Sequence, residues 1–132
     1  MPKISVDEAP TKDLQTRRAT EVVSGAVMGC HEATLRIVEI DPIADVGDRN
    51  PHHHDHMDEV IFVLSGSGTA WDDGETFEVS TDDTILFERG HQHMIVNHTD
   101  EPLRLACFFA DPDIERDFVV DEETTFPVEE LE

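Results

Sequence analysis

The chain has no tyrosine, only two lysines and two cysteines, and no long apolar run. A membrane-spanning helix needs about 20 consecutive apolar residues, and no stretch approaches that length, so we expect no membrane span. The N-terminal segment lacks the apolar core of a signal peptide, which favours a cytoplasmic location. Cys30 and Cys107 lie far apart in no metal-type spacing, which predicts two small buried thiols in a reducing compartment.

Positive charge is also scarce. There are 31 Asp and Glu residues against 9 Lys and Arg, which gives a formal net charge of -22. Such a surface repels phosphate backbones and anionic lipids, so we expect neither nucleic-acid nor membrane partners. Because acid is abundant and lysine is rarer than arginine, the composition resembles that of proteins from halophiles that accumulate salt. Halophilic adaptation is therefore a hypothesis, and it predicts that stability rises with KCl.

Short apolar, β-branched runs recur between turn signals along most of the chain. Its 132 residues fit one domain, and a domain of that size needs no disulfide or metal merely to fold. Asp72-Asp73-Gly74 is a hairpin signal, and a helical alternative exists only near residues 7–18. Many short strands at close spacing predict an all-β sandwich or barrel. The predicted strands cover residues 21–28, 33–40, 60–64, 68–71, 76–79, 84–87, 94–96 and 103–109.

The expected organisation is a single barrel domain with short ends. The barrel should span residues 17–120, after an N-terminal extension of residues 1–16. Its last strand is predicted over residues 117–120. The acid-rich residues 121–132 should then form a loosely held tail.

The segment PHHHDHMDEVIFVLSG, residues 51–66, concentrates histidine just before a strand-like run. Side chains alternate faces along a strand, so His52, His54 and His56 share one face and His53 points the other way. Glu59 has the opposite parity to the three. It joins their face only if the chain bulges or turns between residues 54 and 59.

A second histidine cluster, ERGHQHMIVNH, follows downstream, where Gly90 marks a turn and His91 and His93 share a face. Neutral imidazoles and a carboxylate suit divalent first-row metals such as Fe, Mn, Co, Ni, Cu or Zn. Two imidazoles and a carboxylate from one segment, with an imidazole from another, can surround an ion and leave coordination positions open, as catalytic sites do. The alternative is a set of surface histidines on an acidic protein, and for His53 and His98 we favour that alternative.

The spacing of the first cluster resembles the first motif of the cupin superfamily. His52-x-His54-x4-Glu59-x6-Gly66 fits that motif from its first histidine onward. The preceding glycine of the motif corresponds to Gly47, which is one residue closer than the pattern asks. The match therefore includes every ligand position of the motif.

The second cluster resembles the second cupin motif. Gly90-x2-His93-x3-Asn97 fits, while Asp82 replaces the first glycine of the motif and Glu88 replaces a proline. These two replacements affect turn geometry rather than ligands. Asn97 is expected to hold a turn or strand edge.

The resemblance implies a single-domain, all-β jelly-roll barrel of the cupin type, with a divalent transition metal held inside it. The metal ligands that it implies are His52, His54, Glu59 and His93. Small cupins are commonly homodimers, with an N-terminal strand paired onto the partner's sheet, and residues 20–28 are the candidate strand here.

The same resemblance suggests an enzyme that acts on a small organic molecule. A three-histidine, one-glutamate site resembles that of Fe(II) dioxygenase cupins, while related small cupins catalyse decarboxylation, isomerisation or lyase reactions. Glu59 is a candidate catalytic base as well as a ligand, and His56 is a candidate acid–base group. A tyrosine base is excluded because the chain has none. A non-catalytic cupin that binds a metal or a small molecule is the alternative.

Residues around the metal can be proposed from strand parity. Ile61 and Val63 share the parity of Glu59, so we expect them inside the barrel. Two residues near the turn at Gly90 are candidates for other roles: His91 for proton transfer, and Arg89 for binding a substrate carboxylate at the mouth of the site. The expected apolar wall comprises Phe87, Ile95 and one of Phe108 or Phe109.

Overall fold

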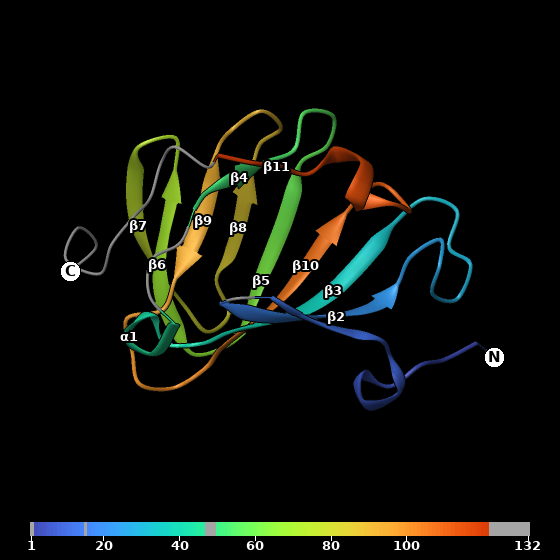
Figure 1. The fold of residues 1–132 in the computed structure, drawn as a ribbon, viewed down its shortest axis with the longest axis horizontal. Helices are drawn as coiled ribbons and strands as arrows, with labels where there is room; N and C mark the ends of the chain where they lie inside the picture. Colours follow the sequence, from blue (N-terminus) through green and yellow to red (C-terminus); the bar gives the residue numbers. More distant parts are fainter. Residues whose placement is uncertain (1, 15, 47–49, 122–132) are drawn as a thin grey trace.

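The computed structural model describes residues 2–14, 16–46 and 50–121, and it shows two antiparallel sheets (Figure 1). The six-stranded sheet has the order β1 (Thr11–Leu14), β2 (Arg17–Val23), β3 (Thr34–Ile40), β10 (Leu103–Phe109), β5 (Glu59–Ser65) and β8 (Thr84–Phe87). The five-stranded sheet has the order β11 (Val119–Val120), β4 (His52–His53), β9 (His93–Val96), β6 (Ser67–Asp72) and β7 (Glu75–Ser80). The helical turns are η1 (Val6–Glu8), α1 (Ile43–Val46) and η2 (Ile114–Asp117). The expected all-β jelly-roll fold is confirmed.

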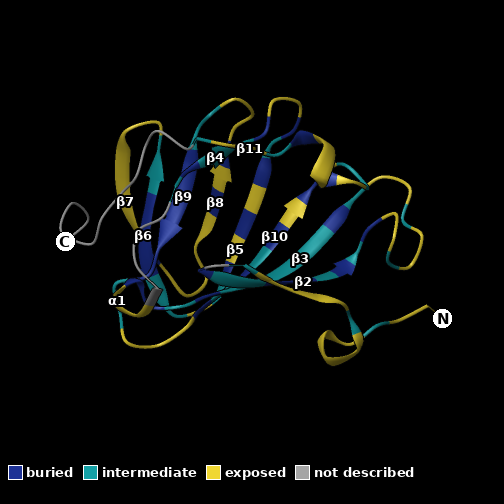
Figure 2. Ribbon diagram, in the orientation of Figure 1, coloured by how far each residue is buried: buried dark blue, intermediate teal, exposed yellow. Residues whose placement is uncertain are grey.

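Period-two patterning places the core between the sheets. Along β5, Ile61 and Val63 are buried, whereas Val60 and Phe62 are exposed, and the strand is striped accordingly in Figure 2. Burying each such side chain stabilises the fold by roughly 1.5–3 kcal/mol. The expected inward position of Ile61 and Val63 is therefore confirmed. No helix in the described part of the chain is long and apolar enough to cross a membrane.

Two turns adopt the backbone that their sequences require. The hairpin between β6 and β7 is closed by Asp73 and Gly74, with φ angles of 46° and 97°. Such left-handed backbone at both central residues matches the twist of paired strands. Asp82, at the position of the cupin glycine, has φ of 75°. Aspartate tolerates this conformation better than most residues, so the turn forms although aspartate stands in place of glycine.

The N-terminal strands differ from the prediction. The strand expected over residues 21–28 instead starts at Arg17 and ends at Val23, and the helical alternative over residues 7–18 is wrong. Ser24 ends the strand, because its backbone and hydroxyl both pair with Val27 in a tight turn. Residues 20–23 pair with β1 and β3 of the same chain. β1 lies within the expected extension of residues 1–16 and forms the edge of the sheet.

The C-terminal strand is shorter than predicted. Residues 117–120 were expected to be extended, but Asp117 belongs to the helical turn η2, and only Val119 and Val120 form a strand. The Asp113 carboxylate accepts a hydrogen bond from the Glu115 amide, which starts the turn. β11 then pairs with β4 and brings Val119 and Val120 beside His53 and His52. The predicted tail, apart from Asp121, lies outside the described residues, as does Gly47.

Candidate metal centre

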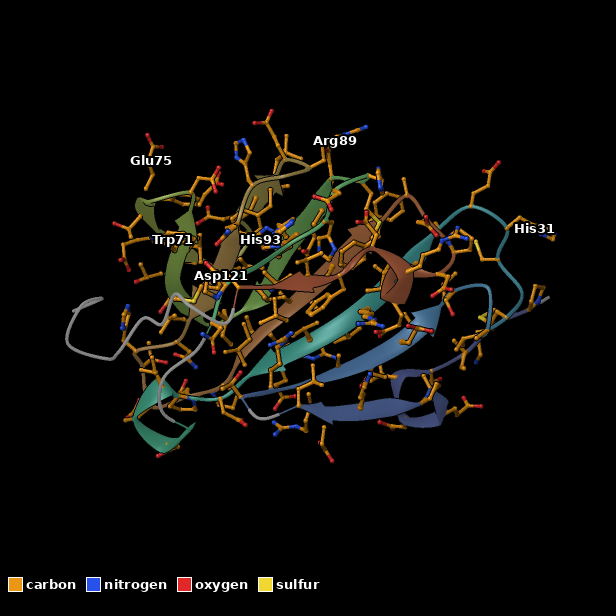
Figure 3. All side chains as sticks on the ribbon, turned by 45° about the horizontal axis from the view of Figure 1, so that its top comes forward. His31, Trp71, Glu75, Arg89, His93 and Asp121 are labelled. Carbon is orange, nitrogen blue, oxygen red and sulfur yellow. The ribbon has the colours of Figure 1, made fainter. Side chains whose placement is uncertain are left out.

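The four residues expected to bind metal come together in the structure. His52 lies on β4, His54 just after it, Glu59 at the start of β5 and His93 at the start of β9. One ligand atom from each lies within 4.8 Å of every other. Oε1 of Glu59 is 3.0 Å from Nε2 of His93, 3.3 Å from Nε2 of His54 and 4.0 Å from Nε2 of His52. Figure 3 shows His93 among the strands, while Arg89 lies at the rim.

A loop between β4 and β5 supplies the irregularity that Glu59 requires. β4 ends at His53, and residues 54–58 are not in a strand. The Asp117 carboxylate accepts hydrogen bonds from the backbone amides of Asp55, at 2.7 Å, and His56, at 2.8 Å. This contact curls the loop, so the Glu59 carboxylate returns to the side on which His52 and His54 point.

Backbone carbonyls fix which imidazole nitrogen faces the centre. Nδ1 of His54 lies 2.6 Å from the Asp117 carbonyl, and Nδ1 of His93 lies 3.0 Å from the His91 carbonyl. A carbonyl only accepts, so both Nδ1 atoms carry hydrogen. In the neutral rings the Nε2 lone pairs then point at the Glu59 carboxylate. Such convergent lone pairs repel one another unless a proton or a metal cation lies between them.

The electrostatics of the centre agree with this geometry. Burial acts to raise the pKa of Glu59, but the contacts of its carboxylate with His54 and His93, and the positive charge that these imidazoles can carry, hold it well below its usual range. Burial and the neighbouring His93 lower the pKa of His52 well below its usual value. For His54, burial lowers the pKa, but the hydrogen bonds to Glu59 and Asp117 outweigh it and raise the pKa. Glu59 is therefore an anion at neutral pH, and His52 is neutral with a nitrogen lone pair available to a metal. Both groups are in the deprotonated form that metal binding requires.

Each imidazole packs against a phenylalanine. His52 stacks on Phe118 with ring centroids 4.5 Å apart, and His93 stacks on Phe87 at 4.2 Å. His54 meets the edge of Phe109 at 5.2 Å. The rings limit the rotation of the imidazoles and keep water away from their backs, which preorganises the ligands.

A cavity opens beside the cluster and is lined mostly by apolar side chains. Its volume is about 60 Å³, so it suits a small molecule. Two arginines, Arg17 and Arg36, also line it, as does Cys107. Burial, and then the negative charge of Glu59, raise the pKa of the Cys107 thiol well above its usual value, which keeps it protonated. The apolar lining residues include Ala19, Val38, Ile40, Ile61, Phe87, Ile95, Leu105 and Phe109.

The expected wall of Phe87 and Ile95 is confirmed, and Phe109 rather than Phe108 completes it. Phe108 is exposed on the outer face of the six-stranded sheet. Asn97 is buried, and its amide donates to the carbonyls of Ile40 and Glu101, so it holds a turn as expected.

The other sequence candidates lie away from the cluster. The His56 side chain is exposed, and it is not among the residues that line the cavity. His91 is half-exposed and hydrogen-bonds Asp72, while the exposed Arg89 pairs with Asp58. His53 pairs with Asp55 and His98 with Thr69, so neither belongs to the centre.

Sequence reasoning missed Arg17, Asp117 and Phe118. Arg17 has the same parity as the buried Ala19, a signal hidden by placing the strand start at residue 21. Asp117 and Phe118 reach the centre only because η2 and β11 fold back onto β4. No local pattern reveals that contact.

The donor set fits a divalent transition metal. Imidazole and carboxylate suit Fe, Mn, Co, Ni, Cu and Zn alike. Ligand bonds of about 2.0–2.2 Å place opposite donors about 4 Å apart, which the 4.8 Å cluster approaches with small side-chain movements. Four protein ligands leave positions open on an octahedral ion, so a bound metal would supply Lewis-acid or redox chemistry beside the cavity.

Comparisons with known proteins place these features in a family. L-ectoine synthase of Mycobacterium sp. (strain KMS) is 26% identical over 122 residues, which covers 91% of this chain and 85% of that protein. The oxalate decarboxylase–formate complex of Lactobacillus farciminis superposes with a TM-score of 0.74 at 20% identity, over 86% of this chain. This chain spans only 34% of that decarboxylase. The Streptomyces nucleoside dehydratase Pac13 superposes with a TM-score of 0.72 at 17% identity. The match covers 92% of this chain and 91% of the dehydratase chain.

The sequence identities to these solved structures are low, so the superpositions show a shared fold alone. The family model described as the cupin domain matches residues 36–109, more than half of the chain. That span includes all four clustered residues, from His52 to His93. The chain therefore belongs to the cupin family.

Proposed function

We propose that this protein is a metal-dependent enzyme that transforms a small organic molecule. One observation carries the proposal: three imidazoles and one carboxylate converge on a single point at the wall of an apolar cavity. A structural metal would have its coordination closed by protein, whereas this cluster faces open space. Inside the cavity, Glu59 is the protein group best placed to accept a proton, and its low pKa makes it a weak base until a metal or substrate rearranges its hydrogen bonds.

Two reaction classes follow from this site. The dioxygenase reaction suggested by the ligand set requires molecular oxygen. Bond cleavage without oxygen is supported by the names of similar proteins, which include a decarboxylase and a dehydratase. In either class the apolar walls exclude water and the ligand cluster orients the substrate. The predicted roles of Glu59 in proton transfer and of His56 as an acid–base group remain proposals, and the exposed position of His56 makes Glu59 the stronger candidate.

Metal analysis tests the first step. Protein purified without a histidine tag and reconstituted separately with each metal should retain close to one ion per chain after gel filtration. Retention of only a trace of every metal would overturn the proposal.

Loaded protein is then incubated with small carboxylates, thiols and diketones, with and without oxygen. Turnover that needs oxygen and places both atoms of labelled O2 in the product identifies a dioxygenase, and turnover under nitrogen identifies the other class.

A non-catalytic binding protein is the second candidate. The small cavity favours it equally, because a site for one small molecule needs no reaction. Metal retention with saturable binding of a carboxylate, but no product by mass spectrometry, would support this candidate.

We also propose that the chain forms a homodimer. Val60, Phe62, Leu86 and Phe108 are 37–54% exposed and lie on adjacent strands of the six-stranded sheet. Exposed apolar faces of this kind mark association surfaces. A second copy carries the same apolar face, so an isologous contact would bury both.

A further inference from the structure

Arg17 is a cation placed in the cavity beside the metal cluster. It begins β2, pairs in register with Ile40 on β3, and lines the cavity together with His52, Glu59 and His93. Its neighbour Arg18 faces the other way and bonds to Glu39 and Asp41. The alternation of the strand therefore sends one arginine inward and the next one outward.

Arg17 differs from most other arginines in having no carboxylate partner. Arg18, Arg36, Arg89 and Arg116 each form an ion pair. Within residues 2–14, 16–46 and 50–121, no ion pair or side-chain hydrogen bond is formed by Arg17. A guanidinium has five N–H donors and does not lose its charge in proteins. Arg17 is half-buried, and partly burying a charge without a partner is costly, a cost that a bound anion would offset.

The charge of Arg17 changes the pKa of a residue in the metal cluster, and the cluster changes the pKa of Arg17. Burial lowers the pKa of Arg17, while the carboxylate of Glu59 acts against that lowering. In turn, the positive charge of Arg17 is one of the causes that lower the pKa of His52. Arg17 and the cluster therefore share one low-dielectric space, and a small molecule in the cavity would meet both.

We propose that Arg17 binds the carboxylate group of a small aliphatic acid whose other end lies at the metal cluster. The position of that other end rests on the proposed function, whereas the contact between Arg17 and the carboxylate does not. A guanidinium holds a carboxylate through two parallel hydrogen bonds.

The surroundings favour a carboxylate over a phosphate. The second arginine of the cavity, Arg36, is already engaged by Glu21 at 2.9 Å and by Glu115 at 3.0 Å. One free guanidinium matches a single carboxylate, and the walls formed by Ala19 and Val38 suit an aliphatic chain. The chain carries a net charge of -22, so any anion it binds needs a local cation of this kind.

Propionate is a suitable probe, and neutral propionamide is its matched control. Binding is measured by isothermal titration to metal-free and zinc-loaded protein in the same KCl concentration. Propionate should bind, and propionamide should bind at least about tenfold more weakly. Arg17→Met, which keeps a long apolar stem, should reduce propionate affinity to the level of propionamide, and Arg17→Lys should recover only part of it. Arg18→Met, on the opposite face, should bind propionate like the wild type.

Two further measurements separate this role from a structural one. Arg17→Met should melt at the same temperature as the wild type or higher, because it removes a half-buried charge that has no partner. The Nε–Hε signal of Arg17 in nitrogen-15 spectra, identified by its loss in Arg17→Lys, should shift with propionate and not with propionamide. Equal propionate binding by Arg17→Met, a lower melting temperature of that variant, or an unmoved signal would each overturn the proposal.

The outcome is independent of the metal proposal. If the protein retains no metal but the Arg17 signal responds to propionate, the proposed function fails and the carboxylate site stands. If metal is retained and propionate affinity is the same in Arg17→Met, the reverse holds.

Discussion

The imidazole of His54 donates a hydrogen bond of 2.6 Å from Nδ1 to the backbone carbonyl of Asp117, 63 positions further along the chain. The carboxylate of Asp117 meanwhile holds the backbone amides of Asp55 and His56. One residue thus orients the His54 imidazole and shapes the loop that returns Glu59 to the cluster. The candidate metal centre is built by η2 and β11 as much as by the two histidine motifs.

The first prediction concerns Asp117. Its replacement by alanine leaves two backbone amides without their acceptor, so we expect a loss of about 1–3 kcal/mol in the free energy of unfolding. Because the ligand loop loosens, metal affinity should fall about 10–100-fold, as for other residues that orient metal ligands. Urea unfolding and chelator competition measure the two effects. Arg116→Ala, in the same helical turn, is the control, because Arg116 is exposed and pairs, among the described residues, only with Asp111, and it should leave metal affinity unchanged. Equal metal affinities in the Asp117 and Arg116 variants would contradict the role of Asp117.

The second prediction concerns the ligands themselves. His54→Ala and Glu59→Gln should each reduce metal retention sharply, because each removes one of four donors. His53→Ala is the matched control, since His53 lies beside the cluster but does not belong to it. Metal content after reconstitution and gel filtration is the measurement. If the His53 variant lost as much metal as the His54 variant, the ligand assignment would be wrong.

The clustering of His52, His54 and Glu59 could be predicted from sequence because their spacing is local. His52 and His54 stand two residues apart, and the loop that Glu59 needs lies in a polar stretch of the same segment. His56 does not join them, because the parity argument assumed a regular strand beyond His53. The Asp117 carboxylate accepts hydrogen bonds from the backbone amides of residues 55 and 56, so the chain is not a regular strand there.

Other parts of the site depend on contacts between distant segments. Phe118 stacks on His52 only because β11 pairs with β4, and this pairing involves two residues on each strand. Strands that short carry too little pattern to be recognised. Arg17 reaches the cavity because β2 starts earlier than its apolar residues suggest, and strand boundaries are set by pairing with β1 and β3 rather than by composition.

The third prediction concerns salt. With 31 acidic and 9 basic residues, the folded chain is destabilised by its own charge at low ionic strength. The melting temperature should therefore rise as KCl increases from dilute to molar, first through screening and then through stronger apolar burial. Differential scanning calorimetry of the metal-free protein measures it. A melting temperature that stays flat or falls would contradict halophilic adaptation.

The fourth prediction concerns pH. The hydrogen bond from Arg36 lowers the pKa of Glu115 below its ordinary value of 4.5. A lowered pKa in the folded state stabilises the fold above the ordinary pKa, and this contribution is lost as pH falls through the folded pKa. Wild type should therefore be more stable than Glu115→Gln at neutral pH, by a small amount because Glu115 is exposed. Urea titrations should show the difference vanishing in acid; a difference that persists there would contradict the assignment.

The last prediction concerns the homodimer. Phe108→Asp places a charge in the exposed apolar face formed with Val60, Phe62 and Leu86, so it should convert a dimer into a monomer of 14.9 kDa in light scattering. Phe77→Asp is the control, because Phe77 is 41% exposed, like Phe108 at 42%, but lies on the other sheet. Two copies that each carry -22 repel each other, so wild-type association should strengthen as KCl screens the charges. A wild type that remains monomeric at high protein and salt concentrations would contradict this use of the face.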